Sequence, residues 1–133
     1  MIVDTSALLA CFDESEEAHE AVCAAIAGAD RCVVSPYVLA ELDYLVTTNH
    51  GRPAQLTVLS ELLENDWELA SLSPEEVAAT VDLVDSAGQT LSVADASNVV
   101  LARRDPQAVI VTLDQQRFSS LHDPDRPPLT VVP

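Results

Sequence analysis

The chain has 133 residues, of which 48 % are hydrophobic and 21 % are charged, so we expect a single domain over residues 1–133 with a sizeable core. The formal net charge is −16, and all six basic residues are arginines, which excludes P-loop and Schiff-base chemistry because both need a lysine. The acidity argues against broad binding of polyanions and favours a basic partner.

Strand-like and helix-like segments alternate along the chain. Short apolar runs predict strands at 1–4, 32–34, 67–72, 108–112 and 129–132. Apolar periodicity and capping signals predict helices at 7–12, 15–27, 36–49, 53–65, 74–87 and 92–104. Glycines at 28, 51 and 88 stand near the ends of three of them. No Asn-Gly or Asp-Gly turn joins neighbouring strands, so we expect an α/β fold with a mostly parallel sheet flanked by helices.

The cysteines and glycines narrow the possible chemistry further. Cys11, Cys23 and Cys32 are odd in number and form no C-x-x-C pair, so we interpret them as small apolar core residues rather than as disulfides or a zinc site. The chain has three glycines and no G-x-G-x-x-G, which disfavours a Rossmann-type nucleotide binder. It shows neither a secretory leader nor an apolar stretch of membrane-spanning length, so we expect a cytoplasmic protein without membrane contact.

Two aspartates follow predicted strands. Asp4 comes directly after the apolar opening of the chain, and Asp114 lies two residues beyond Thr112, which ends the strand-like run from 109. Ligands of parallel sheets bind beyond the carboxyl ends of the strands, so both aspartates are candidates for a site. Ser6 adds a hydroxyl beside Asp4. A role of Asp4 as a helix N-cap is the structural alternative.

A third aspartate opens a predicted helix. Ser92 and Asp95 have the spacing of a capping box, which is a structural role for Asp95. A carboxylate in the first turn of a helix also faces the loops, so capping and ligand binding can coexist. Asn98 lies three residues further on the same helical face and is a candidate supporting residue.

A fourth acid lies in the helix predicted from residue 36. Glu41 and Asp43 flank the apolar stripe of this helix on opposite sides, at about 100° per residue, and periodicity alone does not choose between them. Four acids brought together without competing chemistry would suit a hard divalent cation such as Mg²⁺, which prefers oxygen ligands.

The order of four short motifs resembles that of the PIN domains, and in particular of VapC-type toxins from bacterial toxin–antitoxin pairs. The motifs are Asp4-Thr5-Ser6-Ala7-Leu8, Ser35-Pro36-Tyr37-Val38-Leu39-Ala40-Glu41, Leu91-Ser92-Val93-Ala94-Asp95-Ala96, and Thr112-Leu113-Asp114 with Phe118. The resemblance covers essentially the whole chain. It implies a PIN-like three-layer α/β/α sandwich and an endoribonuclease that depends on Mg²⁺ or Mn²⁺.

The resemblance also assigns site residues. Asp4, Glu41, Asp95 and Asp114 match the acidic site of the family, which favours Glu41 over Asp43, and Thr112 and Ser6 match hydroxyl positions. Some relatives carry a further acid shortly after the last aspartate. Here the residues that follow are Gln115, Gln116 and Arg117, so the number of metal ions that the site binds, one or two, stays open.

The expected function is that of a toxin that hydrolyses RNA. The resemblance implies a cognate antitoxin and a homodimer, and the net charge of −16 would attract a cationic inhibitor. Arg103, Arg104 and Arg117 are candidates for contacts with RNA, although Arg103 and Arg104 also stand where cations favour the end of a helix. The alternative function is a catalytically weak PIN-like regulatory or protein-binding module. The identity of the RNA stays open.

Overall fold

Strand β1, Ile2–Val3, lies at the centre of a five-stranded sheet in the computed structural model, which describes residues 1–65, 67–87, 90–119, 121 and 130–132. The strand order is β3-β2-β1-β4-β5, and every pair is parallel. The other strands are β2 Cys32–Val34, β3 Trp67–Leu69, β4 Val109–Val111 and β5 Thr130–Val132. The expected parallel sheet is therefore confirmed.

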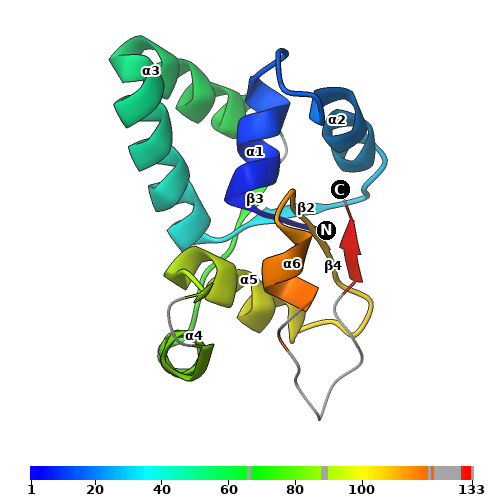
Figure 1. Ribbon diagram of the computed structural model, residues 1–133, viewed down its shortest axis with the longest axis vertical. Helices are drawn as coiled ribbons and strands as arrows, with labels where there is room; N and C mark the ends of the chain where they lie inside the picture. Colours follow the sequence, from blue (N-terminus) through cyan, green and yellow to red (C-terminus); the bar gives the residue numbers. More distant parts are fainter. Residues whose placement is uncertain (66, 88–89, 120, 122–129, 133) are drawn as a thin grey trace.

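Helices fill the connections between the strands (Figure 1). They are α1 Thr5–Phe12, α2 His19–Ala27, α3 Pro36–Glu64, α4 Pro74–Ala87, α5 Val93–Ala102 and α6 Gln115–Ser119. Parallel neighbours need such crossovers, because the chain must return to the same end of the sheet before the next strand begins. Within the described part of the chain, no helix has the length and apolar character needed to span a membrane.

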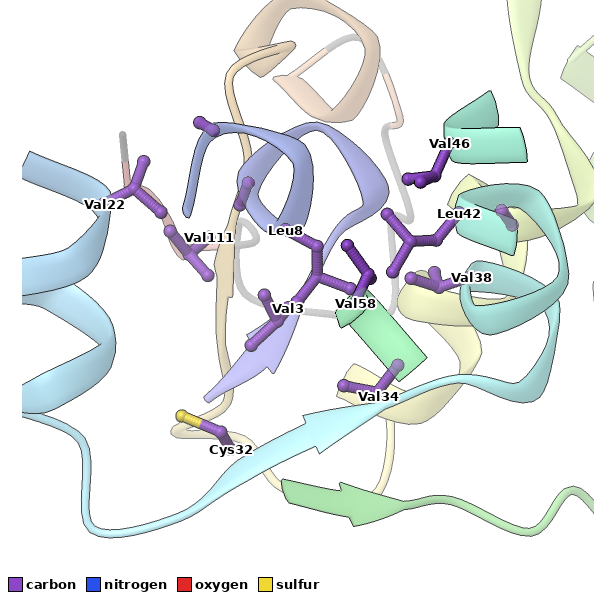
Figure 2. Packing of buried hydrophobic residues seen from close by; sticks show 13 residues of the cluster. Val3, Leu8, Val22, Cys32, Val34, Val38, Leu42, Val46, Val58 and Val111 are labelled. Carbon is purple, nitrogen blue, oxygen red and sulfur yellow. The ribbon is translucent and has the colours of Figure 1, made fainter. Parts of the chain in front are cut away.

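The three inner strands β1, β2 and β4 are apolar on both faces, and they divide the core into two clusters. Val3, Val34 and Val111 pack with residues of α1, α2 and α3, as Figure 2 shows for Leu8. The residues beside them in the strands point to the other face, where Ile2 packs with residues of α5 and α6. Successive side chains of a strand alternate between faces, so an apolar strand in the middle layer supports helices on both sides. The three-layer α/β/α arrangement is confirmed.

Helix α2 begins later than the sequence predicted. The expected start at residue 15 is wrong, because residues 14–18 form turns and α2 begins at His19. The Asp13 carboxylate accepts hydrogen bonds from the backbone N–H of Ser15 at 2.9 Å and from its hydroxyl at 2.6 Å. Such a side-chain turn competes with a helix for the same backbone donor.

Helix α3 is bent where the sequence predicted a break. Gly51 has φ 82° and ψ 178°, a conformation that favours glycine, and it separates two helical halves. Pro53 follows in the second half and lacks the backbone N–H of a regular helix. Across the bend the Gln55 amide donates to the Asp43 carboxylate at 2.5 Å. The predicted helices at 36–49 and 53–65 correspond to these halves.

The remaining differences are small. The third strand ends at Leu69 rather than at 72, and the short helix α6 was not predicted. The helix predicted at 74–87 is confirmed as α4. The predicted start of the last strand, Leu129, lies outside the described residues.

The three cysteines are free thiols. Cys32 is buried in the core as predicted, whereas Cys11 and Cys23 are half-buried between α1 and α2, with their sulfur atoms 3.5 Å apart. Burial, reinforced by the contact with Cys23, raises the pKa of the Cys11 thiol to about 12. Cys11 is therefore a poor nucleophile at neutral pH, because only the thiolate reacts readily.

Candidate functional site

Asp4 lies at the carboxyl end of the central strand and is only 4 % exposed. Its backbone N–H donates to the carbonyl of Val111 in β4 at 3.1 Å, so it continues the pairing of β1 with β4. It occupies the N-cap position of α1 but its side chain makes no capping hydrogen bond. The capping alternative for Asp4 is thus not observed, and its carboxylate is directed to other partners.

Three polar side chains surround the Asp4 carboxylate. Its Oδ2 accepts hydrogen bonds from the hydroxyls of Ser6 at 2.8 Å and Thr112 at 2.7 Å. Its Oδ1 accepts from the Asn98 amide at 3.1 Å. The Thr112 hydroxyl in turn accepts from the backbone N–H of Asp114 at 3.0 Å. The predicted supporting residues therefore meet at Asp4, and Thr112 also fixes the loop that carries Asp114.

Glu41 approaches this cluster from α3. Its Oε2 accepts a hydrogen bond from the Thr5 hydroxyl at 2.6 Å, and Thr5 is the next residue after Asp4. Asp43, the alternative that periodicity left open, accepts instead from Gln55 across the bend in α3. The structure thus places Glu41, and not Asp43, beside the end of β1.

Asp95 comes from the first turn of α5 and is 3 % exposed. It forms the predicted capping box, in which its Oδ2 accepts from the backbone N–H of Ser92 at 3.0 Å and its own N–H donates to the Ser92 hydroxyl at 3.1 Å. The same Oδ2 lies 3.3 Å from Nη1 of Arg117. One oxygen of Asp95 therefore caps α5 and also contacts the Arg117 guanidinium.

Asp114 and Arg117 complete the cluster from the loop after β4 and the first turns of α6. Nε of Arg117 lies 2.6 Å from Oδ2 of Asp114, and Nη1 of the same guanidinium contacts Asp95. Partial burial lowers the pKa of the Arg117 guanidinium, but the negative charges of Asp95 and Asp114 outweigh it, and Asp4 adds to them, so the pKa is raised. Arg117 thus lies in the field of three predicted site aspartates.

The other two predicted RNA contacts lie elsewhere. Arg104 follows the last turn of α5, roughly 13 Å along the helix from Asp95 at 1.5 Å per residue. Its Nε and Nη2 contact the two carboxylate oxygens of Glu76 in α4, each at 2.7 Å. Arg103, the C-cap residue of α5, is at the same end of the helix. Of the three arginines, Arg117 contacts predicted site carboxylates, those of Asp95 and Asp114. Arg103 and Arg104 lie at the far end of α5 from Asp95.

The arrangement of donors can be compared with the needs of a divalent cation. Among the described residues, no three His, Cys, Asp or Glu side chains are grouped closely enough to hold a metal ion. The acids are linked through hydroxyls, an amide and the Arg117 guanidinium instead. All nearby ligand atoms are oxygens, and Oδ1 of the fully buried Asn98 has no hydrogen-bond partner within the described part of the chain. This donor chemistry fits Mg²⁺ or Mn²⁺, provided that Arg117 moves aside.

Comparison with known proteins defines the class. The family model described as "PIN domain" matches residues 1–123, and the chain belongs to the PIN domain family. It is 48 % identical over 135 aligned residues to ribonuclease VapC26 of Mycobacterium tuberculosis (strain ATCC 25618 / H37Rv), and the alignment covers 100 % of both chains. The predicted resemblance to PIN domains and VapC-type proteins is therefore confirmed.

A solved structure supports the fold independently. The crystal structure of VapC20 of Mycobacterium tuberculosis, described as a sarcin-ricin loop cleaving toxin, superposes with a TM-score of 0.77. The match covers 95 % of this chain and 98 % of that chain, at 19 % sequence identity. At this identity the likeness concerns the fold.

Three contacts of the site were missed by reasoning from the sequence. The hydrogen bond from Thr5 to Glu41 joins residues 36 positions apart, and no local pattern reports it. The ion pair of Arg117 with Asp114 had a local signal, because residues three apart face each other in a helical turn. The contact of Arg117 with Asp95 had none, since it depends on how α6 and α5 pack.

Proposed function

We propose that this chain is a metal-dependent endoribonuclease that acts in the cytoplasm as the toxin of a toxin–antitoxin pair, and that residues 1–133 form one PIN domain. Membership of the PIN family and the full-length similarity to a ribonuclease support this assignment. The observation that carries it is the buried Asp4 carboxylate at the end of the central strand, held by Ser6, Thr112 and Asn98. Such a group is costly to bury, and a structural role as a helix cap is not observed.

In the proposed site Asp4 and Asp95 would hold Mg²⁺ or Mn²⁺ directly, and Glu41 and Asp114 would hold it directly or through water. When bound, the cation supplies an acidified water as nucleophile and positive charge opposite the scissile phosphate. Ser6 and Thr112 orient the Asp4 carboxylate, and Asn98 holds its other oxygen. Thr5 orients Glu41 in the same way. The products are two RNA fragments formed by addition of water across one phosphodiester bond.

The RNA substrate must tolerate a strongly acidic surface, so we propose that the protein contacts it locally, near the cation and Arg117. Unpaired segments suit this mode, because their bases and backbone can be approached without opening a helix. Arg104 is a weaker candidate for an RNA contact, since Nε and Nη2 of its guanidinium already donate to Glu76, and Nη2 also donates to the Ser71 carbonyl.

Cleavage of RNA by the purified chain tests the assignment. We expect cleavage with Mg²⁺ or Mn²⁺, loss of cleavage with a chelator, and loss of cleavage in Asp4→Asn, which keeps the side-chain shape and removes its charge. Asp30→Asn is a matched control, because Asp30 lies in the loop that precedes the amino end of β2. The proposed site lies at the carboxyl ends of the strands, on the opposite edge of the sheet. Metal-independent cleavage, or full activity of Asp4→Asn, contradicts the proposed site. Stable RNA binding without any cleavage favours the alternative of a binding module.

We further propose an antitoxin as partner. An apolar groove of about 280 Å³ lies between α3 and the edge of the sheet and is lined by Leu39, Leu62, Leu63 and Trp67 among others. Leu63 is 87 % exposed, and an amphipathic helix of a partner would cover it. The net charge of −16 favours a cationic partner, and an arginine of that partner would suit the carboxylates of the site.

Purification from the native host tests the partner, and light scattering of the purified toxin tests the proposed homodimer. We expect a small basic protein to co-purify and to block cleavage, and Leu63→Asp to weaken its binding. We expect the free toxin to have the mass of a dimer at micromolar concentration. An active nuclease that purifies without a partner contradicts the first expectation, and a monomeric mass with full activity contradicts the second.

A further inference from the structure

Arg117 joins two carboxylates that come from different elements of the fold. Its side chain is 50 % exposed, whereas those of Asp95 and Asp114 are 5 % and 37 % exposed. The guanidinium therefore supplies positive charge to a carboxylate that is almost completely buried, and a buried charge without a partner is strongly unfavourable. The 2.6 Å contact with Asp114 is short, and the 3.3 Å contact with Asp95 is at the long end of a hydrogen bond.

The same two carboxylates are ligands in the proposed metal site, so a guanidinium and a divalent cation compete for them. Both are positive, and each reduces the negative potential that attracts the other. A cation that binds Asp95 and Asp114 together takes the oxygens that Arg117 contacts. The two states of the site therefore exclude each other.

We propose that Arg117 is a built-in counter-ion of the metal site, which occupies the carboxylates before the divalent cation binds, is displaced by it, and then contacts a phosphate of the RNA. This inference rests on the proposed function for the identity of the site. In this proposal Arg117 lowers the affinity of the site for the metal ion, and after its displacement it makes a positioning contact with the substrate.

The structure allows this displacement without unfolding of α6. Phe118, the next residue, is 1 % exposed and anchors the short helix in the second core cluster. The backbone N–H of Arg117 faces Oδ1 of Asp114 at 3.4 Å. The half-exposed side chain can reach solvent by rotation about its own torsions, a motion that takes nanoseconds for exposed residues. The displaced guanidinium stays close to the site, where the phosphate must arrive.

Binding of Mn²⁺ in the absence of RNA tests the first part, with free Mn²⁺ followed by electron paramagnetic resonance. We expect Arg117→Gln to bind Mn²⁺ about tenfold more tightly than the wild type at low salt, the scale of coupling between neighbouring charges partly screened by water. Arg104→Gln is the matched control, since it removes the same charge from the pair with Glu76, and its Mn²⁺ affinity should equal that of the wild type. Arg117→Lys keeps the charge and should stay within about twofold of the wild type.

Equal Mn²⁺ affinity of Arg117→Gln and the wild type overturns the proposal, and so does an equal gain in Arg104→Gln or Arg117→Lys. Cleavage kinetics test the second part. Arg117→Gln should reach half-maximal cleavage at a lower Mn²⁺ concentration but with a lower maximal rate, and an unchanged maximal rate overturns the phosphate contact. If no variant cleaves RNA, the proposed function fails, while the Mn²⁺ titration still decides the role of Arg117.

Discussion

Arg104 and Arg117 both pair with carboxylates, but the two pairs differ in charge balance. Arg104 faces the single carboxylate of Glu76 with two contacts of 2.7 Å, and one positive charge meets one negative charge. Arg117 divides its contacts between Asp95 and Asp114 and lies in the field of Asp4 as well. The first pair links the segment after α5 to α4, and its two charges balance each other. The second leaves negative charge uncompensated, which is the property of a cation site.

The two pairs should differ most in RNA cleavage, when one carboxylate of each pair is neutralised in turn. We expect Asp95→Asn to lower the rate of RNA cleavage about a thousandfold or more, because it removes the negative charge of a proposed ligand of the cation. Glu76→Gln should leave cleavage close to the wild-type rate. Rates with saturating Mn²⁺ on the same RNA measure both. Similar losses in the two variants would remove the distinction between the pairs.

A second experiment concerns what holds Arg117 in place. Phe118→Ala should lower the free energy of unfolding by about 3 kcal/mol, because it leaves a cavity beside β4 and loosens α6. Val81→Ala, at a side chain that is 55 % exposed, should change it by less than about 0.5 kcal/mol. Denaturant titration measures both free energies. A small effect of Phe118→Ala would mean that α6 is held by other contacts.

The smallest effect concerns the balanced pair and its dependence on pH. Hydrogen bonds from Arg104, and then from the backbone of Ser73, lower the pKa of Glu76 from 4.5 to about 2. A carboxylate with a lowered pKa in the folded state adds stability above its unfolded pKa and loses it as the pH falls toward the folded value. Glu76→Gln should therefore cost less than about 1 kcal/mol at pH 7, since the pair is partly exposed, and the difference should vanish between about pH 4.5 and 2. Thermal unfolding across this pH range would show it, and a difference that persists at pH 2 would contradict the assignment.

Much of this architecture could be predicted from the sequence. Apolar strands and helix caps gave the parallel sheet, and the position of Asp4 and Asp114 after two strands that prove to be neighbours placed both at one edge. The Ser92–Asp95 capping box was visible because its partners lie three residues apart. Patterns of this kind are local, and they report which face a residue occupies.

The contacts between elements could not be predicted in the same way. Glu41 and Asp43 are equivalent by helical periodicity, and only the partners Thr5 and Gln55 distinguish them. The late start of α2 depends on the Asp13 side chain, which competes for a backbone donor that a helix would otherwise use. The bridge from Arg117 to Asp95 depends on the packing of α6 against the sheet, which no spacing in the sequence encodes.

The order of the strands also has a consequence for synthesis of the protein. β1 comes first in this sequence and lies between β2 and β4, and the Asp4 carboxylate is held by Asn98 and Thr112, more than ninety positions further along. A ribosome therefore releases most of the chain before these partners can meet, because contacts at long sequence separation form only after the later segment has emerged. A nascent chain of this nuclease therefore carries its acids without an assembled site until the segment that holds Asn98 and Thr112 has been synthesised.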